Sequence, residues 1–151
     1  MLFLLLYLDN GCYALDASLV VEVLPLVRIE KPLRSPQGVV GTINYRRALV
    51  PVIDLSELAL GRPAAPRLST RIILVRCSEE DGQPRLLGLI AEKAIETMRC
   101  QSADFVPSGI TNADASYLGA ITMGPRGLVQ RIELNKLLPA AVPGMALKQS
   151  A

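Results

Sequence analysis

The 151-residue sequence contains no histidine and no tryptophan, and only 4% of its residues are aromatic. Histidine is the commonest general base and a frequent zinc ligand, so its absence removes the usual catalytic triads and most zinc sites. The three cysteines include no Cys-x-x-Cys pair, and their odd number and wide spacing are typical of reduced thiols. We therefore expect a protein that is not an enzyme, with no cofactor and no metal site.

The sequence also lacks long apolar runs and a large excess of either positive or negative charge. No apolar run is long enough to cross a bilayer, and the opening MLFLLLYLDN lacks the basic start of a signal peptide. The 16 basic and 14 acidic residues are scattered, so charge alone predicts neither a nucleic-acid nor a membrane surface. We therefore expect a soluble, cytoplasmic protein. Half of the residues are hydrophobic, which favours a partner-binding protein with some apolar side chains on its surface.

Short apolar runs separated by turn residues predict a mainly β fold. The predicted strands cover residues 2–8, 11–15, 20–29, 40–46, 48–53, 71–77, 85–99, 117–123 and 128–133. The runs LFLLLYL and RIILVRC are continuously apolar, which indicates strands covered on both faces. A single open sheet cannot cover that many strands on both faces, so we expect a closed or doubled β architecture.

Turn and cap residues divide this pattern further. EEDGQP and MGPRG predict two hairpin turns, and Asp54 and Gly61 predict the start and end of a short helix. A second helical turn at 133–138 should stop at Pro139. We expect one domain over residues 1–138 and a poorly ordered tail over 139–151.

Two groups of carboxylates could imitate a catalytic acid pair. Residues 79–81 (Glu-Glu-Asp) lie together on a predicted hairpin tip, which indicates a solvated turn rather than a sheltered site. Asp54 and Glu57 are also close in sequence, but capping of the short helix explains both residues without a reaction.

The most specific stretch is GTINYRRALVPVIDL, residues 41–55. It resembles the signature of the CheW-like coupling proteins of bacterial chemotaxis arrays, which reads G-x-x-N-x-R-G followed by V-P-V-I-D-L. Asn44 and Arg46 match this signature, whereas Arg47 stands where the family has glycine. A glycine there would allow a positive φ that a β-carbon disfavours, so either the turn is remodelled or Arg47 tolerates strain. Further segments fall in the family's order over residues 2–138, among them VVEV at 20–23.

The resemblance implies a fold and a function. It implies two small five-stranded SH3-like β-barrels packed together, with one or two short helices. It also implies a non-enzymatic adaptor that couples the cytoplasmic tips of chemoreceptors to a CheA-type histidine kinase, in the cytoplasm and recruited to membrane receptor arrays. Neither nucleic-acid binding nor direct membrane insertion is implied.

The resemblance also suggests which residues bind partners. The residues that match its receptor-binding positions are Val20, Glu22, Val23, Asn44 and Arg46. Gly41 matches a position on the kinase-binding side, although a bulge or a strand-end glycine explains it equally well. Pro51 cannot donate to a β-ladder, which predicts an edge strand or a bulged strand at that point.

Three alternatives remain open at this stage. A small β-barrel could bind nucleic acid through its arginines, although stacking aromatics are scarce. A hydrolase could use Asp54 and Glu57. A divergent paralogue with the same fold could serve a receptor–kinase pathway other than motility, and Arg47 is a mild hint of this.

Overall fold

The computed structural model describes residues 1–31, 39–78, 84–109 and 117–141, and they form a mainly β structure. The chain order is β1 (Leu2–Leu8), β2 (Gly11–Asp16), 3-10 helix η1 (Ala17–Leu19), β3 (Val20–Pro25), β4 (Val39–Tyr45), β5 (Ala48–Asp54), α1 (Leu55–Leu60), β6 (Arg71–Ser78), β7 (Pro84–Ala91), β8 (Lys93–Arg99), 3-10 helix η2 (Ser102–Asp104), β9 (Leu118–Gly124), β10 (Gly127–Ile132) and α2 (Leu134–Ala141).

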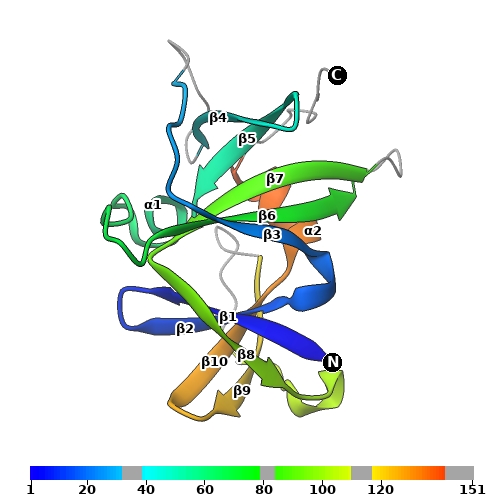
Figure 1. Ribbon diagram of the computed structural model, residues 1–151. Coiled ribbons are helices and arrows are strands. Elements are labelled where there is room, and N and C mark those ends of the chain that lie inside the picture. The colour runs from blue at the N-terminus through cyan, green and yellow to red at the C-terminus, as the bar shows by residue number, and fades with distance from the viewer. Residues whose placement is uncertain (32–38, 79–83, 110–116, 142–151) are drawn as a thin grey trace.

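The strands form two five-stranded sheets, and a bridge closes each sheet into a barrel. The first barrel has the strand order β8-β1-β2-β10-β9, and the second has β3-β6-β7-β5-β4. Glu30, beyond the end of β3, exchanges two backbone hydrogen bonds of 2.9 Å with Thr42 of β4. Val106 and Ile121 close the first barrel in the same way. Figure 1 shows the second barrel above the first, which confirms the expected pair of small barrels.

Three apolar clusters explain the continuously apolar strands. Along β6, Ile72 and Leu74 point into the second barrel, whereas Ile73 and Val75 point into a cluster between the barrels. Strand β1 alternates in the same way, with Phe3 and other residues inside the first barrel. Because successive side chains of a strand point to opposite faces, both faces of these strands are buried. The prediction from LFLLLYL and RIILVRC is thus confirmed.

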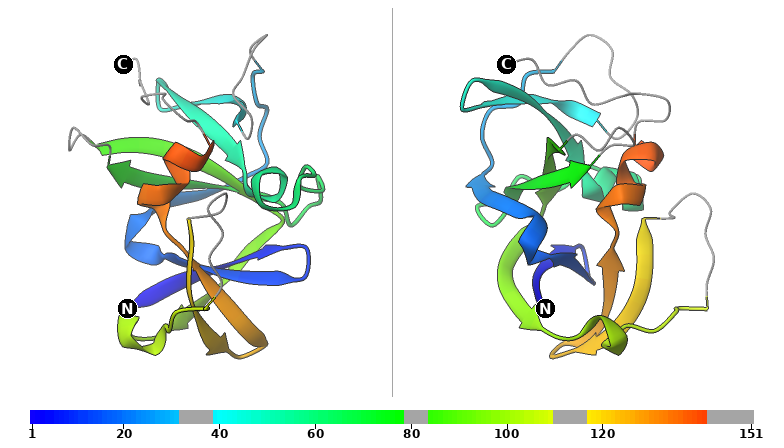
Figure 2. Two further views of the ribbon diagram at one scale, coloured as in Figure 1. Left: turned by 180° about the vertical axis from the view of Figure 1, so that it is seen from behind. Right: turned by 90° about the vertical axis from the view of Figure 1, so that its right-hand side faces the viewer.

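Two of the strands predicted from the sequence are longer than the strands in the structure. Residues 85–99 form two strands, since the chain bends at Glu92 and passes from β7 in the second barrel to β8 in the first. Figure 2 shows this passage from behind and from the side. An apolar pattern shows burial but not a change of sheet. Strand β3 ends at Pro25 instead of continuing to residue 29, because the chain then leaves β6 and turns towards β4.

The strand pairing of the two predicted hairpins and the first helix are confirmed. The β6–β7 pair ends at Ser78 and Pro84, although the turn itself and the acidic residues 79–81 lie outside the described residues. Strands β9 and β10 form the other hairpin. Helix α1 starts after the cap residue Asp54 and ends at Gly61, whose φ of 75° is left-handed.

The second helix is longer than expected. Helix α2 passes through Pro139 and ends at Ala141, so the predicted stop at Pro139 is wrong. The proline lies in the last turn, where the missing N–H costs a single intrahelical hydrogen bond. Nothing is described beyond residue 141. In the part of the chain that the structure describes, no helix combines the length and the hydrophobicity needed to cross a membrane.

Pro51 lies in an inner strand, so the prediction of an edge strand is wrong. Strand β5 is flanked by β4 on one side and by β7 on the other. Its parallel pairing with β7 begins only at Val52, one residue after the proline. The irregular register in this region lies in β4, between Val39 and Gly41. Pro51 is accommodated because it stands just outside the parallel ladder.

Candidate functional site

A cluster of polar side chains lies at one end of the second barrel. The Tyr45 hydroxyl, at the end of β4, donates a hydrogen bond to Glu22 Oε2 on β3. The Arg46 guanidinium lies over the Tyr45 ring, 5.3 Å from its centroid. We call Glu22, Tyr45 and Arg46 the tyrosine cluster. Glu22 and Arg46 were both predicted from the sequence to bind the receptor. The structure brings them together around Tyr45, which the sequence did not predict as a site residue.

The β4–β5 turn beside the tyrosine cluster has two residues with positive φ. Tyr45 pairs with Ala48, so Arg46 and Arg47 form a two-residue hairpin loop. Their φ angles are 48° and 70°, the pair of positive values that defines a type I′ turn. Asn44 Oδ1 accepts a hydrogen bond of 3.2 Å from the Arg47 backbone N–H. The turn is therefore not remodelled: Arg47 adopts the conformation that favours glycine, and Asn44 supports it.

Replacing Arg47 by glycine should therefore stabilise the protein. Glycine removes the β-carbon strain at a φ of 70°, and after the larger backbone entropy loss of glycine we expect a gain of about 0.5–1 kcal/mol. Urea unfolding followed by circular dichroism measures the change. Arg76→Gly, in the middle of β6, is the matched control and should destabilise the protein. A loss of stability in Arg47→Gly would show that the arginine side chain makes a contact worth more than the strain.

The environment of Tyr45 keeps its hydroxyl protonated. The hydrogen bond to the Glu22 carboxylate raises the pKa of Tyr45, and partial desolvation adds to this, while the nearby Arg46 acts in the opposite direction. A protonated phenol can donate its hydrogen to a carboxylate, whereas a phenolate could not. The raised pKa of Tyr45 therefore extends this contact towards more alkaline pH.

The two predicted valines lie on a different face of β3. Val23 pairs with Ile73, whose side chain lies in the cluster between the barrels. Directly paired residues share a face of a sheet, so Val23 faces the junction of the two barrels. Val20 packs against the same inter-barrel cluster. The apolar strip consists of the exposed hydrophobic residues along this segment, Val21, Val23, Leu26 and Val27. The structure therefore places Glu22, Asn44 and Arg46 at the barrel end, Val23 in this strip, and Val20 against the inter-barrel cluster.

Gly41 is buried and has a clear structural role. It follows the irregularity in β4, next to the bridge that closes the second barrel. A β-carbon at this position would lie 2.2 Å from the Glu30 carbonyl oxygen. The glycine is needed because the backbone at Glu30 approaches so closely. Its assignment to the kinase-binding side stays a prediction, and any such effect would act through the shape of β4.

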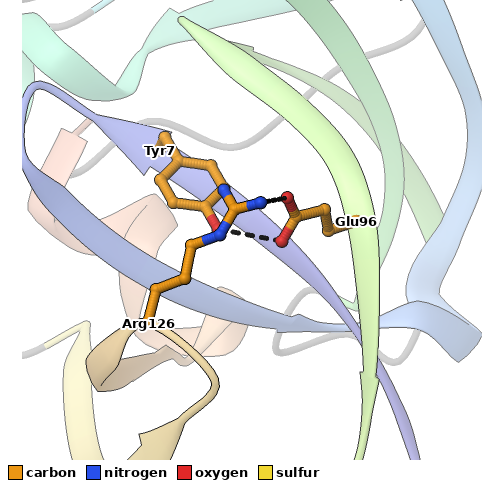
Figure 3. A network of polar contacts seen from close by, with 3 residues as sticks. All are labelled: Tyr7, Glu96 and Arg126. Atoms are coloured by element: carbon orange, nitrogen blue, oxygen red, sulfur yellow. Dashed lines mark hydrogen bonds and ion pairs between the residues drawn. The ribbon is translucent and has the colours of Figure 1, made fainter.

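The first barrel carries a similar cluster that the sequence did not reveal. Glu96 on β8 accepts a hydrogen bond of 3.1 Å from the Tyr7 hydroxyl and forms an ion pair of 2.6 Å with Arg126 of the β9–β10 turn. Figure 3 shows the Tyr7 and Arg126 side chains both reaching the Glu96 carboxylate. Partial burial, with Cys12 and Glu96 contributing, raises the pKa of Tyr7 to about 12. No spacing in the sequence links β1, β8 and the β9–β10 turn.

Comparison with known proteins identifies the family. A family model described as the CheW-like domain matches residues 2–142. This chain belongs to the CheW-like domain family. A search of solved structures finds the crystal structure of the scaffolding protein TtCheW from Thermoanaerobacter tengcongensis, with 27% sequence identity and a TM-score of 0.79, covering 99% of this chain and 98% of that chain. No curated protein sequence matches this chain.

Membership in the CheW-like family confirms the resemblance drawn from residues 41–55. The family supports a scaffolding or adaptor role and does not favour the nucleic-acid alternative. Sequence reasoning missed Tyr45 because it occupies the variable position between Asn44 and Arg46 in the signature. Only the closure of the second barrel brings this position opposite Glu22.

Proposed function

We propose that this CheW-like protein is a non-enzymatic adaptor that couples the cytoplasmic tips of chemoreceptors to a CheA-type histidine kinase. The observation that carries the proposal is the exposed tyrosine cluster at the end of the second barrel, in a chain of the CheW-like family. At this end of the barrel, exposed Arg46 lies next to half-buried Tyr45, and Asn44 is also exposed. Asn44 and Arg46 match the receptor-binding part of the signature. The proposed receptor-binding residues are Val20, Glu22, Val23, Asn44 and Arg46, and Gly41 is proposed for the kinase side.

The two arginines of the turn suit a polar partner. A guanidinium offers several donors in a planar fork and can bind carboxylates and exposed carbonyls together. Neither Arg46 nor Arg47 forms an ion pair with any carboxylate of the described residues. Their donors are therefore available to a receptor tip.

The apolar strip supplies the second kind of contact. Val21 and Val23 are each 38% exposed, and Leu26 and Val27 continue the strip at 39% and 41%. Several exposed apolar side chains along one segment of the chain are typical of partner-binding surfaces. A helical receptor tip that contacts both the strip and the tyrosine cluster would combine apolar burial with directional polar contacts.

The geometry of Asp54 does not favour the hydrolase alternative. Its two carboxylate oxygens accept hydrogen bonds from the backbone N–H groups of Ser56, Glu57 and Ala64. Asp54 is also only 3% exposed. A general base must reach the proton that it abstracts, and this carboxylate is turned into the protein.

Reversing the charge of Arg46 tests the proposed function. Arg46→Glu should weaken binding to a purified receptor signalling fragment by about tenfold or more, because it replaces an attractive charge by a repulsive one. Binding to the CheA-type kinase should weaken less than receptor binding, because the proposal assigns Arg46 to the receptor interface. Co-sedimentation and calorimetry with each partner measure the two affinities.

The control is Arg99→Glu, which makes the same charge change at an exposed position of β8 in the first barrel. It should leave receptor binding at the wild-type value. Equal receptor binding by Arg46→Glu and wild type would remove Arg46 from the interface. A wild-type protein that binds neither partner would refute the adaptor function, and one that binds a receptor and kinase of another pathway would place it outside motility.

A further inference from the structure

The two barrels repeat one strand pattern, so equivalent positions can be compared within the chain. Strand β1 pairs antiparallel with β8 and β2, β2 pairs parallel with β10, and β10 pairs antiparallel with β9. Strands β6, β3, β7, β5 and β4 take the same roles in the second barrel. Within this pattern Glu96 pairs with Leu5 and Glu22 pairs with Leu74, and each leucine is buried inside its own barrel. Glu96 and Glu22 therefore occupy equivalent positions.

The two equivalent glutamates have different partners. Glu96 forms an ion pair of 2.6 Å with Arg126, in the turn that joins β9 and β10. Glu22 has two arginines in the equivalent β4–β5 turn, yet within the described parts of the chain it pairs with neither of them. Its carboxylate instead accepts the hydrogen bond from Tyr45. The first barrel thus compensates its turn arginine, and the second barrel does not.

The residue that precedes each turn differs between the two barrels. Gly124, which has no side chain, precedes the β9–β10 turn. Tyr45 stands at the equivalent position before the β4–β5 turn. Its hydroxyl occupies the Glu22 carboxylate, while its ring face attracts the Arg46 guanidinium by a cation–π contact of 5.3 Å. In the first barrel the tyrosine that binds the glutamate, Tyr7, comes from β1, and Arg126 still reaches the other carboxylate oxygen of Glu96. In the second barrel a single side chain contacts both the glutamate and a turn arginine.

We propose that Tyr45 is a positioning residue that keeps Glu22 from neutralising Arg46, so that the Arg46 guanidinium is presented to a carboxylate of the receptor tip. The proposal rests on the proposed function, which supplies the receptor as the partner. Arg46 binds its partner directly in this arrangement, and Tyr45 acts through Glu22 and Arg46. The uncompensated charge identifies a carboxylate as the partner group, because an ionised acceptor forms the strongest hydrogen bonds with a guanidinium.

The test is Tyr45→Phe, which keeps the ring and removes only the hydroxyl. In this variant Glu22 loses the hydrogen bond that ties it to Tyr45 and can turn towards Arg46. Binding to the receptor signalling fragment should then weaken by about three- to fivefold, the size of a competing exposed ion pair. In a Glu22→Gln background the same substitution should change affinity by less than about 1.5-fold, since no carboxylate remains to compete. Tyr7→Phe removes the hydrogen bond of a tyrosine hydroxyl to Glu96 in the first barrel and should leave receptor binding unchanged.

A measurement on the free protein separates this proposal from the adaptor function. In Tyr45→Phe the Arg46 side-chain N–H signals, observed by nitrogen-15 NMR, should shift and exchange more slowly with water as the ion pair with Glu22 forms. Glu22→Gln should abolish that change. In the Glu22→Gln single variant the pKa of Tyr45 should fall, because the hydrogen bond to the carboxylate is the first cause of its elevation.

The outcomes are distinguishable. If Tyr45→Phe costs the same receptor affinity in the wild-type background as in the Glu22→Gln background, Tyr45 contacts the receptor itself, and the positioning role is refuted. Unchanged Arg46 signals in free Tyr45→Phe would refute it as well. Failure of the wild-type protein to bind a receptor fragment would refute the adaptor function, while the NMR comparison would still decide whether Tyr45 separates Glu22 from Arg46.

Discussion

Replacing Gly41 by alanine should lower the free energy of unfolding by about 3 kcal/mol, at the upper end of the usual range for overpacking a buried site. The added β-carbon would lie 2.2 Å from the Glu30 carbonyl oxygen and 2.7 Å from Ile29 Cγ2. The nearer atom belongs to the backbone, so no side-chain rotation can relieve the clash. The variant must move Glu30 away from Thr42 and open the bridge that closes the second barrel. Urea unfolding measures the loss, and hydrogen exchange at the Thr42 amide locates it.

Gly109→Ala is the matched control for Gly41→Ala. Gly109 has a φ of 76°, and an added β-carbon would meet no atom within 4 Å. Its substitution should cost only the strain of a positive φ, about 1 kcal/mol. Equal losses in the two variants would show that the close approach of Glu30 does not determine the need for a glycine at position 41.

The Gly41 variant also bears on the predicted kinase contact. A change that opens the second barrel displaces the β4–β5 hairpin, which carries Asn44 and Arg46. We therefore expect Gly41→Ala to weaken receptor binding together with any kinase binding. A variant that stays fully folded and loses only the kinase would instead support a direct role of Gly41 on the kinase side.

The sequence predicts most of the elements because local signals define them. The alternation of side chains along β1 and β6 is so strongly apolar that it predicts two covered faces without any knowledge of the topology. Asp54 and Gly61 predict the ends of α1 because capping is a local interaction. These features depend on neighbours within a few residues, which a single sequence contains.

The features that the sequence does not predict depend on tertiary contacts. Nothing local marks Glu92 as the point where the chain changes barrel, since the apolar pattern continues on both sides. Pro51 is compatible with an inner strand only because the parallel partner starts one residue later. The contact between Tyr45 and Glu22 spans 23 residues and arises from closure of the second barrel. Comparison with a family signature predicts Glu22 and Arg46, but it leaves the variable position between Asn44 and Arg46 unassigned.

Replacing Asp54 by alanine should destabilise the protein by about 3 kcal/mol, because it removes a charged acceptor from several backbone donors at once. Asp54 Oδ1 accepts hydrogen bonds from the N–H groups of Ser56 at 2.9 Å and Glu57 at 3.2 Å, and Oδ2 accepts one from Ala64 at 2.9 Å. The carboxylate therefore caps α1 and also fixes the segment that follows it. Ser56 is fully buried, so water cannot easily replace the lost acceptor. Urea unfolding of the purified variant measures the effect.

Two further variants separate the cap from a catalytic role. Asp54→Asn keeps one acceptor oxygen and should recover about half of the lost stability, and Glu57→Ala should cost less than about 1 kcal/mol, the size of a favourable charge in the first turn of a helix. Receptor binding by Asp54→Asn, measured where the variant is folded, should equal that of wild type, since Asp54 is distant in the chain from Glu22 and is buried below the surface. A fully stable Asp54→Ala variant would contradict the structural role that the three hydrogen bonds assign to this carboxylate. Loss of a hydrolytic activity on substitution of both Asp54 and Glu57, with stability intact, would restore the enzyme alternative, because a residue that only caps a helix cannot affect turnover without affecting folding.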